Sequence, residues 1–425
     1  MNREGSTGWH SPGVLVAGGV TGPGGAGGSA PADGPGTVDQ DPERVALLTV
    51  AREWGRIGCI GFGGPPTHIA LLRALCVEQR RWLSAREFED AIAATNLLPG
   101  PASTQLAIFC AWRLRGPLGA LVGGVCFIVP GLVLILALSA VFLASRPPLW
   151  IRGAAAGAGA AVPVVALSAA LGLAPASWRR AGPSRPARAR WAGYLLAGGA
   201  SAALVGPFLV LVLAGCGLVE LLVRAGSRGV SGQRSALLPA LAIPAAAGGG
   251  LLSVAWVAVK VGALSYGGGF VIIPLMQHDA VHTYHWMTNA QFLSAVALGQ
   301  VTPGPVVQTV AVVGYAAAGL GGGLLAALIA FAPSFLFVLA GGSRFGRLRR
   351  NAGVQAFLTG AGPAAIGAIA GATIPLGLAL SHLWQLGVLA LAAAWLLALR
   401  RGVVTALVGA AGLGVIAALA GGSVS

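Results

Sequence analysis

The sequence predicts an all-α polytopic integral membrane protein that consists of two homologous halves. Charged residues make up only 9% of the 425 residues, whereas an ordinary soluble domain carries about 25%. The mean hydropathy is +0.80, which is too apolar for a water-soluble chain of this length. Tryptophan, phenylalanine and a Pro-Gly-Pro triplet also recur in one register, 204 residues apart.

Long segments without Asp, Glu, Lys or Arg predict the membrane-spanning helices. A helix needs about 20 apolar residues to cross a bilayer. The longest uncharged segments, residues 286–343 and 351–399, can therefore hold two or more crossings each. Shorter uncharged segments cover residues 116–145, 153–178, 191–219, 235–259 and 402–425.

The net charge of +15 indicates a membrane topology and no nucleic-acid partner. Arginines gather between the apolar segments, for example at residues 73–86, 179–190 and 344–350. Loops rich in arginine stay on the cytoplasmic side of a membrane. We therefore expect a multi-pass protein in the inner (cytoplasmic) membrane of a bacterium, with the lipid bilayer as its partner.

Composition divides the chain into four parts. Residues 1–44 hold 12 glycines and few large apolar residues, so they predict a disordered tail and no signal peptide. Residues 45–177 form the first predicted membrane repeat, and residues 236–425 form the second. Residues 178–235 are expected to be a basic linker with additional membrane segments.

The repeat is visible when 204 is added to each residue number. Residues 61–64 then fall on 265–268, Trp82 falls on Trp286, and Phe88 falls on Phe292. Between residues 82–101 and 286–305, seven of 20 positions are identical, including the final Pro-Gly-Pro. Chance matches of Ala and Gly do not explain a matched Trp and Phe, so we interpret the halves as a duplication.

The charges of the two halves predict that the repeat is inverted. The arginine-rich residues 73–86 correspond to residues 277–290, which contain no arginine. Loops that are basic in only one copy lie on opposite sides of the membrane, as in inverted-repeat transporters. Arg146 and Arg152 argue against inversion, because their counterparts near residues 344–350 are also basic.

Each half contains two clusters of helix-breaking residues, which predict broken or re-entrant helices. The clusters are residues 61–66 and 99–101, then residues 267–269 and 303–305. Gly and Pro interrupt the helical hydrogen bonds, and freed backbone groups in a bilayer must be buried or hydrated. Matched breaks point to a binding site near the middle of the membrane, and exposed helix N-termini favour an anion. Packing glycines and kinks are the alternative interpretation.

Two cations and several neutral polar residues complete the candidate site. Lys260 is flanked by uncharged segments, and Arg56 is its counterpart 204 residues earlier. Intramembrane cations are usually functional, and two of them suit a dianion. Snorkelling to the membrane surface, and an ion pair of Arg56 with Glu53, are the alternatives. The candidate substrate-binding residues are Arg56, Gly63, Gly64, Thr67, Asn96, Pro99, Gly100, Pro101, Gln105, Lys260, Gly267, Gly268, Gln300, Pro303, Gly304, Pro305 and Gln308.

No pattern in the sequence predicts a metal, a cofactor or an enzyme. Five cysteines are scattered in apolar segments without any CxxC spacing. His278 and His282 have an i, i+4 spacing that could hold zinc, but Asp279 is the only carboxylate nearby. No nucleophile–base arrangement or phosphate-binding loop is present, so a membrane-embedded enzyme is the weakest alternative.

The motifs resemble those of the chromate ion transporter family in its long, two-domain form. The resemblance rests on Gly-Phe-Gly-Gly-Pro at residues 61–65, on both Pro-Gly-Pro triplets and on the spacing of Trp82 and Phe88. It implies export of chromate, with sulfate as a related oxyanion, driven by ion gradients. We expect the membrane potential or a proton gradient to drive export, and a homodimer is a candidate assembly. Transport of sulfate or another small anion is the main alternative. The resemblance also implies functional sensitivity at Gly63, Gly64, Pro99, Gly100, Pro101, Pro303, Gly304 and Pro305.

Overall fold

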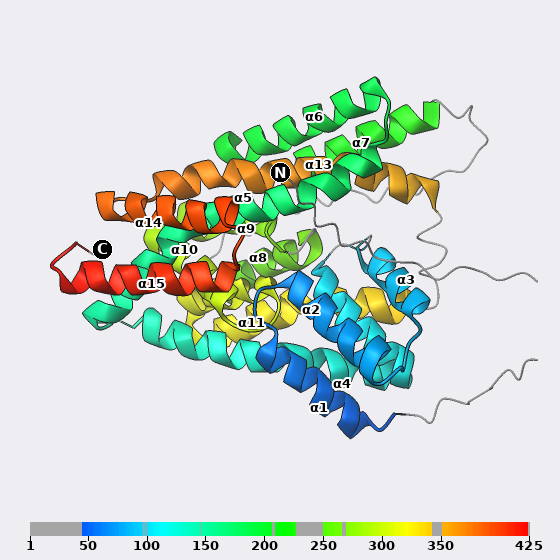
Figure 1. Cartoon of the computed structure of the whole chain (residues 1–425), viewed down its shortest axis with the longest axis horizontal. Helices are drawn as coiled ribbons and strands as arrows, with labels where there is room; N and C mark the ends of the chain where they lie inside the picture. Colours follow the sequence, from blue (N-terminus) through cyan, green and yellow to red (C-terminus); the bar gives the residue numbers. More distant parts are fainter. Residues whose placement is uncertain are drawn as a thin grey trace, which may run out of the picture. The chain divides into compact units, whose positions relative to one another are not determined.

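The computed structural model describes a helical protein. The described residues are 45–96, 98, 100–144, 146–205, 209–226, 250–265, 269–341 and 351–423. The tail predicted at residues 1–44 lies outside them. The first repeat contains α1 (Leu47–Ile60), α2 (Pro65–Arg73), η1 (Ala74–Gln79), α3 (Ala85–Thr95), α4 (Ala102–Phe142), α5 (Leu149–Ala181), α6 (Arg185–Ala200), η2 (Ser201–Val205) and α7 (Leu209–Gly226), as labelled in Figure 1.

The second repeat has the same order of elements as the first. Leu47, Ala74 and Ala85 begin α1, η1 and α3, and the residues 204 positions later begin α8, η4 and α10. The structure therefore confirms two homologous halves. The elements are α8 (Leu251–Leu264), α9 (Ile272–Gln277), η4 (His278–Thr283), α10 (Asn289–Val301), η5 (Val306–Gln308), α11 (Thr309–Gly341), α13 (Ala352–Leu378), α14 (Leu383–Ala393), η6 (Ala394–Ala398) and α15 (Val403–Leu419).

The elements α4 and α11 each consist of two helices that meet at a glycine kink, where the chain folds back on itself in the same way. Gly116 has φ 60° and ψ −149°, and Gly319 has φ 63° and ψ −154°. The preceding residues, Arg115 and Ala318, are likewise non-helical, with φ −142° and −151°. A positive φ is readily adopted only by glycine, which explains why both kinks are placed at this residue type. The duplication therefore extends beyond the segments that match in sequence.

Contacts between α4 and α11 show that the repeats are inverted. Gly124 of α4 lies against Phe335 of α11, while Leu136, further along α4, lies against the earlier residue Gly323. The segments of α4 and α11 that follow their kinks therefore run antiparallel, although they are counterparts in the duplication. Corresponding helices that run in opposite directions are the geometry of an inverted repeat, so the prediction from the charges is confirmed.

The two repeats exchange their C-terminal helices. The helix α5 packs against α14 and α15 of the second repeat, and its counterpart α13 packs against α6 and α7 of the first (Figure 1). Gly157 of α5 touches Gly414 of α15, and Gly367 of α13 touches the Leu195 carbonyl of α6. Small residues let membrane helices approach closely and pack by van der Waals contact. The exchange makes each repeat depend on the other for its packing.

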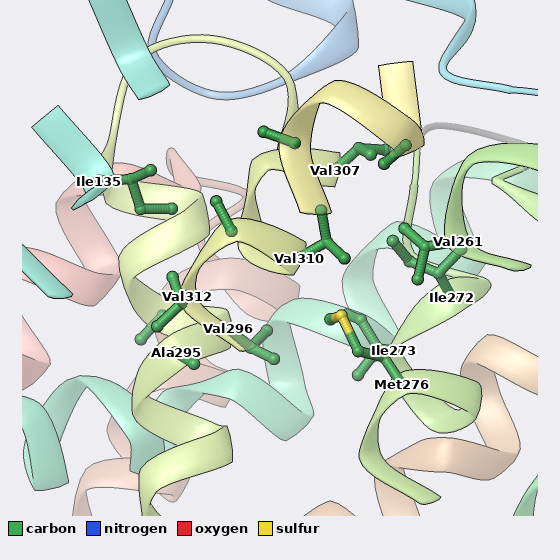
Figure 2. Packing of buried hydrophobic residues seen from close by; sticks show 14 of the residues in the cluster. Ile135, Val261, Ile272, Ile273, Met276, Ala295, Val296, Val307, Val310 and Val312 are labelled. Carbon is green, nitrogen blue, oxygen red and sulfur yellow. The ribbon is translucent and has the colours of Figure 1, made fainter. Parts of the chain in front are cut away.

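Buried apolar side chains of both repeats form one large cluster. Figure 2 shows Val261 of α8, Ile272 and Met276 of α9, and Val310 of α11 in the same buried cluster. All four are at most 1% exposed. Close packing of this kind supports the loops that surround it, because a well-packed interior resists small displacements.

The outer surface of the helices is apolar, as expected for a multi-pass membrane protein. Among the described residues, five helices are long and apolar enough to cross a membrane, and three shorter helices are also apolar. Leu328 and Leu336 of α11 are 72% and 64% exposed. Apolar surface on this scale is stable only in contact with lipid. The five helices are α4, α5, α7, α11 with η5, and α13.

The segment expected to be a linker, residues 178–235, contains α6 and α7 among its described residues. The expected boundary at residue 177 falls within α5, which ends at Ala181. In the order of elements, α6 and α7 correspond to α14 and α15 of the second repeat. The described residues 178–205 and 209–226 thus complete the first repeat, and residues 227–235 lie outside the described residues.

Candidate functional site

The first helix break places a glycine loop between α1 and α2. Gly63 and Gly64 have φ of 95° and 76°, which side-chain-bearing residues rarely adopt. Pro65 then starts α2, because proline fits the first turn of a helix. Gly64 is buried and lies against Val306 of the second repeat, whereas Gly63 is exposed. The loop therefore reaches the opposite repeat at its buried end.

His68 fixes this loop from inside the protein. Its side chain is fully buried, and Nε2 lies 2.9 Å from the carbonyl oxygen of Gly61. A carbonyl only accepts, so Nε2 carries the proton, and Nδ1 accepts from the hydroxyl of Ser103 at 3.3 Å. The sequence shows His68 beside the break, but it was not among the candidate site residues. Its signal is a lone histidine four residues after a glycine pair in an apolar segment.

The second Pro-Gly-Pro loop contacts the same carbonyl. The backbone N–H of Gly304 donates to the Gly61 oxygen at 3.0 Å, so the first break and the second Pro-Gly-Pro loop are joined across the repeats. Gly304 has φ 104°, a conformation that favours glycine. Pro303 and Pro305 on either side are both buried. Gly61 and Gly304 are 243 residues apart in sequence, so the geometry brings together two distant breaks.

A glutamine folds over the central glycine of each Pro-Gly-Pro loop. The amide of Gln308 lies against Gly304, and Nε2 donates to the Ile128 carbonyl of α4 at 2.8 Å. In the first repeat, Gln105 lies against Gly100, which has φ 119°. The two glutamines occupy neighbouring, non-identical positions in the duplication, since Gln105 corresponds to Thr309. They nevertheless take the same place in their loops.

Each Pro-Gly-Pro loop lies against the long helix of the opposite repeat. A Cβ added at Gly131 of α4 would be 2.0 Å from the carbonyl oxygen of Pro303, so only glycine fits there. In the pseudo-symmetric position, Gly100 lies against the hydroxyl of Ser334 on α11. Both contacts directly follow a proline inside the helix, Pro130 or Pro333. The candidate site therefore lies between the two repeats and is built by both.

Several buried polar atoms near the breaks have no hydrogen-bond partner within the protein. Most are hydroxyls or an amide nitrogen, which can donate to an anion or to water, and one is an amide oxygen, which can only accept. A buried polar group without a partner costs about 1–3 kcal/mol, so it usually binds water or a ligand. Among the described residues, these atoms include Thr104 Oγ1, Ser265 Oγ, Gln300 Nε2, Gln308 Oε1 and Ser334 Oγ.

The two candidate cations lie in different surroundings despite their matched positions. Lys260 is partly buried, and its Nζ is 2.5 Å from Asp279 Oδ2 and 5.4 Å from the ring centre of Trp256. Arg56 is exposed on α1. Glu53, expected to pair with Arg56, instead contacts Arg80 at 2.8 Å. The position matching Asp279 in the first repeat is Leu75, so the Lys260–Asp279 pair belongs to the second repeat alone.

The remaining candidate residues are spread around the two loops. Asn96 is exposed at the end of α3, Thr67 is half-buried in α2, and Pro101 is buried directly before α4. Gln300 is buried in α10, three residues before the second loop begins. Pro99, Gly267 and Gly268 lie outside the described residues.

The described residues contain no group of three or more His, Cys, Asp or Glu side chains that could hold a metal ion. The rings of His278 and His282 are 6.0 Å apart, and His278 contacts the hydroxyl of Thr283. The chemistry that the site offers is therefore neutral hydrogen bonding at the loops, with one paired cation on α8.

Comparison with known proteins assigns the family. A family profile described as chromate transporter matches residues 48–221 and 252–416. The chain belongs to the chromate transporter family. The two matched regions coincide with the two repeats, and the sites discussed above lie within them. No solved structure matches the chain.

Relatives of this chromate transporter family member carry matching names. A chromate transport protein of Cupriavidus metallidurans is 31% identical over 76% of this chain and 80% of its own length. A probable chromate transport protein of Synechococcus elongatus is 29% identical, over 82% of this chain and 90% of its own. A chromate transport protein of Pseudomonas aeruginosa is 30% identical, over 80% and 83%. The chain is thus a multi-pass membrane transporter of this family.

Proposed function

We propose that this protein exports chromate across the cytoplasmic membrane through a site between its two repeats. The observation that carries the proposal is the meeting of the breaks, in which the Gly304 N–H donates to the Gly61 carbonyl of the opposite repeat. Sites between inverted repeats suit alternating access, because one repeat can move against the other around a fixed ligand. The names of the relatives support chromate as the substrate.

The unpartnered buried groups support an oxyanion as the ligand. Thr104, Ser334 and Gln300 present hydroxyls and an amide nitrogen, which can donate to the oxygens of a tetrahedral anion. Neutral donors bind an anion without the strong attraction that would slow its release. In this proposal, Lys260 compensates part of the charge from α8. Arg56 is exposed, so its contribution is confined to attracting the anion.

The membrane potential favours the proposed direction of transport. Moving one charge across the membrane is worth about 2.3 kcal/mol per 100 mV, or about 4.6 kcal/mol for a dianion. A dianion that leaves a cell with a negative interior gains this energy. Export can therefore run on the potential alone or together with proton exchange, without ATP.

Chromate uptake into everted membrane vesicles tests the proposal. Export from cells becomes uptake in everted vesicles, and an inside-positive potential should accelerate it. Sulfate added in excess distinguishes the substrates, because a sulfate transporter would show stronger inhibition by sulfate than by unlabelled chromate. Uptake equal to that of vesicles without the protein would overturn the proposal.

A further inference from the structure

A cavity lies away from the helix breaks, at the N-terminal end of α10. It encloses about 320 Å³ between the ends of α4, α5, α10 and α14. A water molecule occupies about 30 Å³ in the liquid, so the space holds a tetrahedral anion with several waters. Arg152 and Thr288 in its wall are exposed, whereas Ser294 and Gln385 are buried. The cavity therefore leads from the surface into the protein.

The polar groups that this cavity offers are mainly hydrogen-bond donors. Arg152 contributes a guanidinium, and none of the lining residues is Asp or Glu. Gln291 and Gln385 use their Oε1 atoms to cap helices, accepting from the backbone N–H groups of Thr288 and His382 at 2.8 and 3.1 Å. Because an N–H can only donate, these bonds assign the two amides. The group that each glutamine can turn to the cavity is its Nε2 donor.

The corresponding place in the first repeat has the opposite chemistry. Gln291 of α10 corresponds to Glu87 of α3, and both residues close the same capping box at the start of their helix. Glu87 carries a negative charge and contacts Arg113 at 2.5 Å. The duplication thus retains the cap in both copies but places a carboxylate at one end of the protein and a neutral amide at the other.

The inverted repeat places these two ends on opposite sides of the membrane. The arginine-rich end near α3 is cytoplasmic by the distribution of basic loops, so the cavity at α10 faces the exit side for an exported anion. The helix α10 has 13 residues and ends two positions before Pro303. At 1.5 Å per residue, the start of α10 lies about 20 Å from the second Pro-Gly-Pro loop, and Ser294, deeper in the cavity wall, lies about 14 Å from it.

We propose that this cavity is an exit vestibule that binds the transported oxyanion through Arg152, Gln291 and Gln385. The proposal rests on the proposed function and adds a second anion site, separate from the breaks. A guanidinium with two amide donors matches the oxygens of a tetrahedral dianion. The vestibule holds the anion briefly before release into bulk water.

The substitution Gln291→Glu tests the vestibule without removing the helix cap. Glu87 shows that glutamate closes the same capping box, so the variant keeps its fold while it places a carboxylate in the cavity. The measurement is chromate exchange in right-side-out vesicles, where the vestibule faces the medium, and in everted vesicles. Gln291→Glu and Arg152→Gln should raise the half-saturating external chromate about tenfold in right-side-out vesicles, equivalent to about 1.4 kcal/mol. The value in everted vesicles should stay the same.

Arg146→Gln is the matched control, because Arg146 is exposed nearby but does not line the cavity. Arg146→Gln should leave the half-saturating chromate concentration unchanged in both right-side-out and everted vesicles. Equal effects of Arg146→Gln and Arg152→Gln would show a general surface-charge effect and overturn the vestibule. The vestibule would also be overturned if Gln291→Glu left the half-saturating chromate concentration unchanged, or changed it equally in both vesicle orientations. Either result would leave the proposal of chromate export standing. Absence of exchange by the wild-type protein in both orientations would instead overturn the proposed function, and the vestibule with it.

Discussion

The carbonyl oxygen of Gly61 is the atom at which the two repeats meet. It accepts from His68 Nε2 of its own repeat and from the Gly304 N–H of the other. The His68 ring also stands edge-on to Phe127 of α4, with ring centres 5.0 Å apart. Because both ring nitrogens form hydrogen bonds, the neutral imidazole holds α2, α4 and the glycine loop together.

Loss of the His68 ring should therefore weaken both the fold and the transport site. His68→Ala leaves the Ser103 hydroxyl and part of the Gly61 carbonyl without a partner, so we expect a destabilisation of about 2 kcal/mol and slower chromate uptake. Thermal unfolding in detergent and vesicle uptake measure the two effects. His282→Ala is the control, since His282 is exposed. Wild-type stability and uptake in His68→Ala would contradict the assigned role.

The Lys260–Asp279 pair allows the structural and the transport role of the cation to be separated. Lys260→Ala leaves a partly buried carboxylate without its partner, which should cost about 3 kcal/mol of stability. The double variant Lys260→Met, Asp279→Leu removes both charges and should regain most of that stability. We expect its chromate uptake to stay low, because no cation remains on α8. Thermal unfolding and uptake are measured together, and recovery of both would show that the pair is purely structural.

At the residue scale, the sequence predicts which polar residues lie in the protein interior better than it predicts which residues they contact. Lys260, Gln300 and Gln308 can be selected as polar groups in apolar segments, and all three are buried or partly buried. The partner of Glu53 could not be selected. A spacing of three residues favours Arg56, but the turn after η1 returns the chain so that Arg80 lies beside Glu53. Such pairings depend on tertiary structure, which local spacing does not contain.

At the scale of elements, the two capping boxes start α3 and α10 with different chemistry. The backbone N–H of Ser84 donates to the Glu87 carboxylate, and this bond, with the nearby Arg113, lowers the pKa of Glu87 below its ordinary 4.5. A lowered pKa in the folded state means that the charged cap stabilises the protein above about pH 4.5 and that this contribution is lost as the pH falls further. Gln291 does not titrate, so the cap of α10 is independent of pH.

This difference predicts the behaviour of Glu87→Gln. The variant should melt at a lower temperature than the wild type at pH 7, because it loses the charged cap and the contact with Arg113. The difference should shrink as the pH falls below 4.5, because the carboxyl then takes up a proton in the unfolded wild-type chain before it does so in the folded protein. Melting curves in detergent from pH 7 to pH 3.5 provide the measurement. A difference that is constant across this range would show that the Glu87 charge does not contribute.

The helix breaks could be predicted, whereas the kinks within α4 and α11 could not. Clustered Gly and Pro in apolar segments mark the breaks at residues 61–66 and 303–305. The chain has 67 glycines, and Gly319 is indistinguishable in sequence from a packing glycine, although Gly116 is followed by Pro117. Only the backbone angles show that these two residues bend their helices in the same way.

At the scale of the whole molecule, the exchanged helices explain why each repeat depends on the other for its packing. The helix α5 of the first repeat packs against α15, and α13 of the second packs against α6 and α7. The duplication and its inversion follow from matched aromatic residues and from unequal loop charges. The exchange of helices cannot be predicted from the sequence, because helix faces rich in Ala and Gly fit many partner helices equally well.

The antiparallel contact of α4 with α11 can be tested by cross-linking. Cysteines at positions 136 and 323 should form a disulfide, because Leu136 and Gly323 touch. The pair Leu136→Cys with Phe335→Cys should not, since Phe335 lies beside Gly124 at the other end of the contact. Oxidation of the double variants in membranes, followed by gel mobility after cleavage between the repeats, measures the linkage. The reverse pattern would contradict the inverted arrangement.

The central claim is that the anion passes between the repeats where the Pro-Gly-Pro loop lies against α4. Gly131 is the position that tests it, because any Cβ there overlaps the Pro303 carbonyl and the Gln308 amide. Gly172 of α5 is the matched control, since a Cβ there meets nothing within 4 Å. The substitution is identical in both cases, and the helical background is the same.

The measurement is the initial rate of chromate uptake into everted vesicles that contain equal amounts of folded wild-type protein, Gly131→Ala or Gly172→Ala. Displacement of the loop by about 1 Å should slow uptake by Gly131→Ala at least about tenfold. Gly172→Ala should transport at the wild-type rate. Equal rates for all three proteins would contradict a transport site between the repeats.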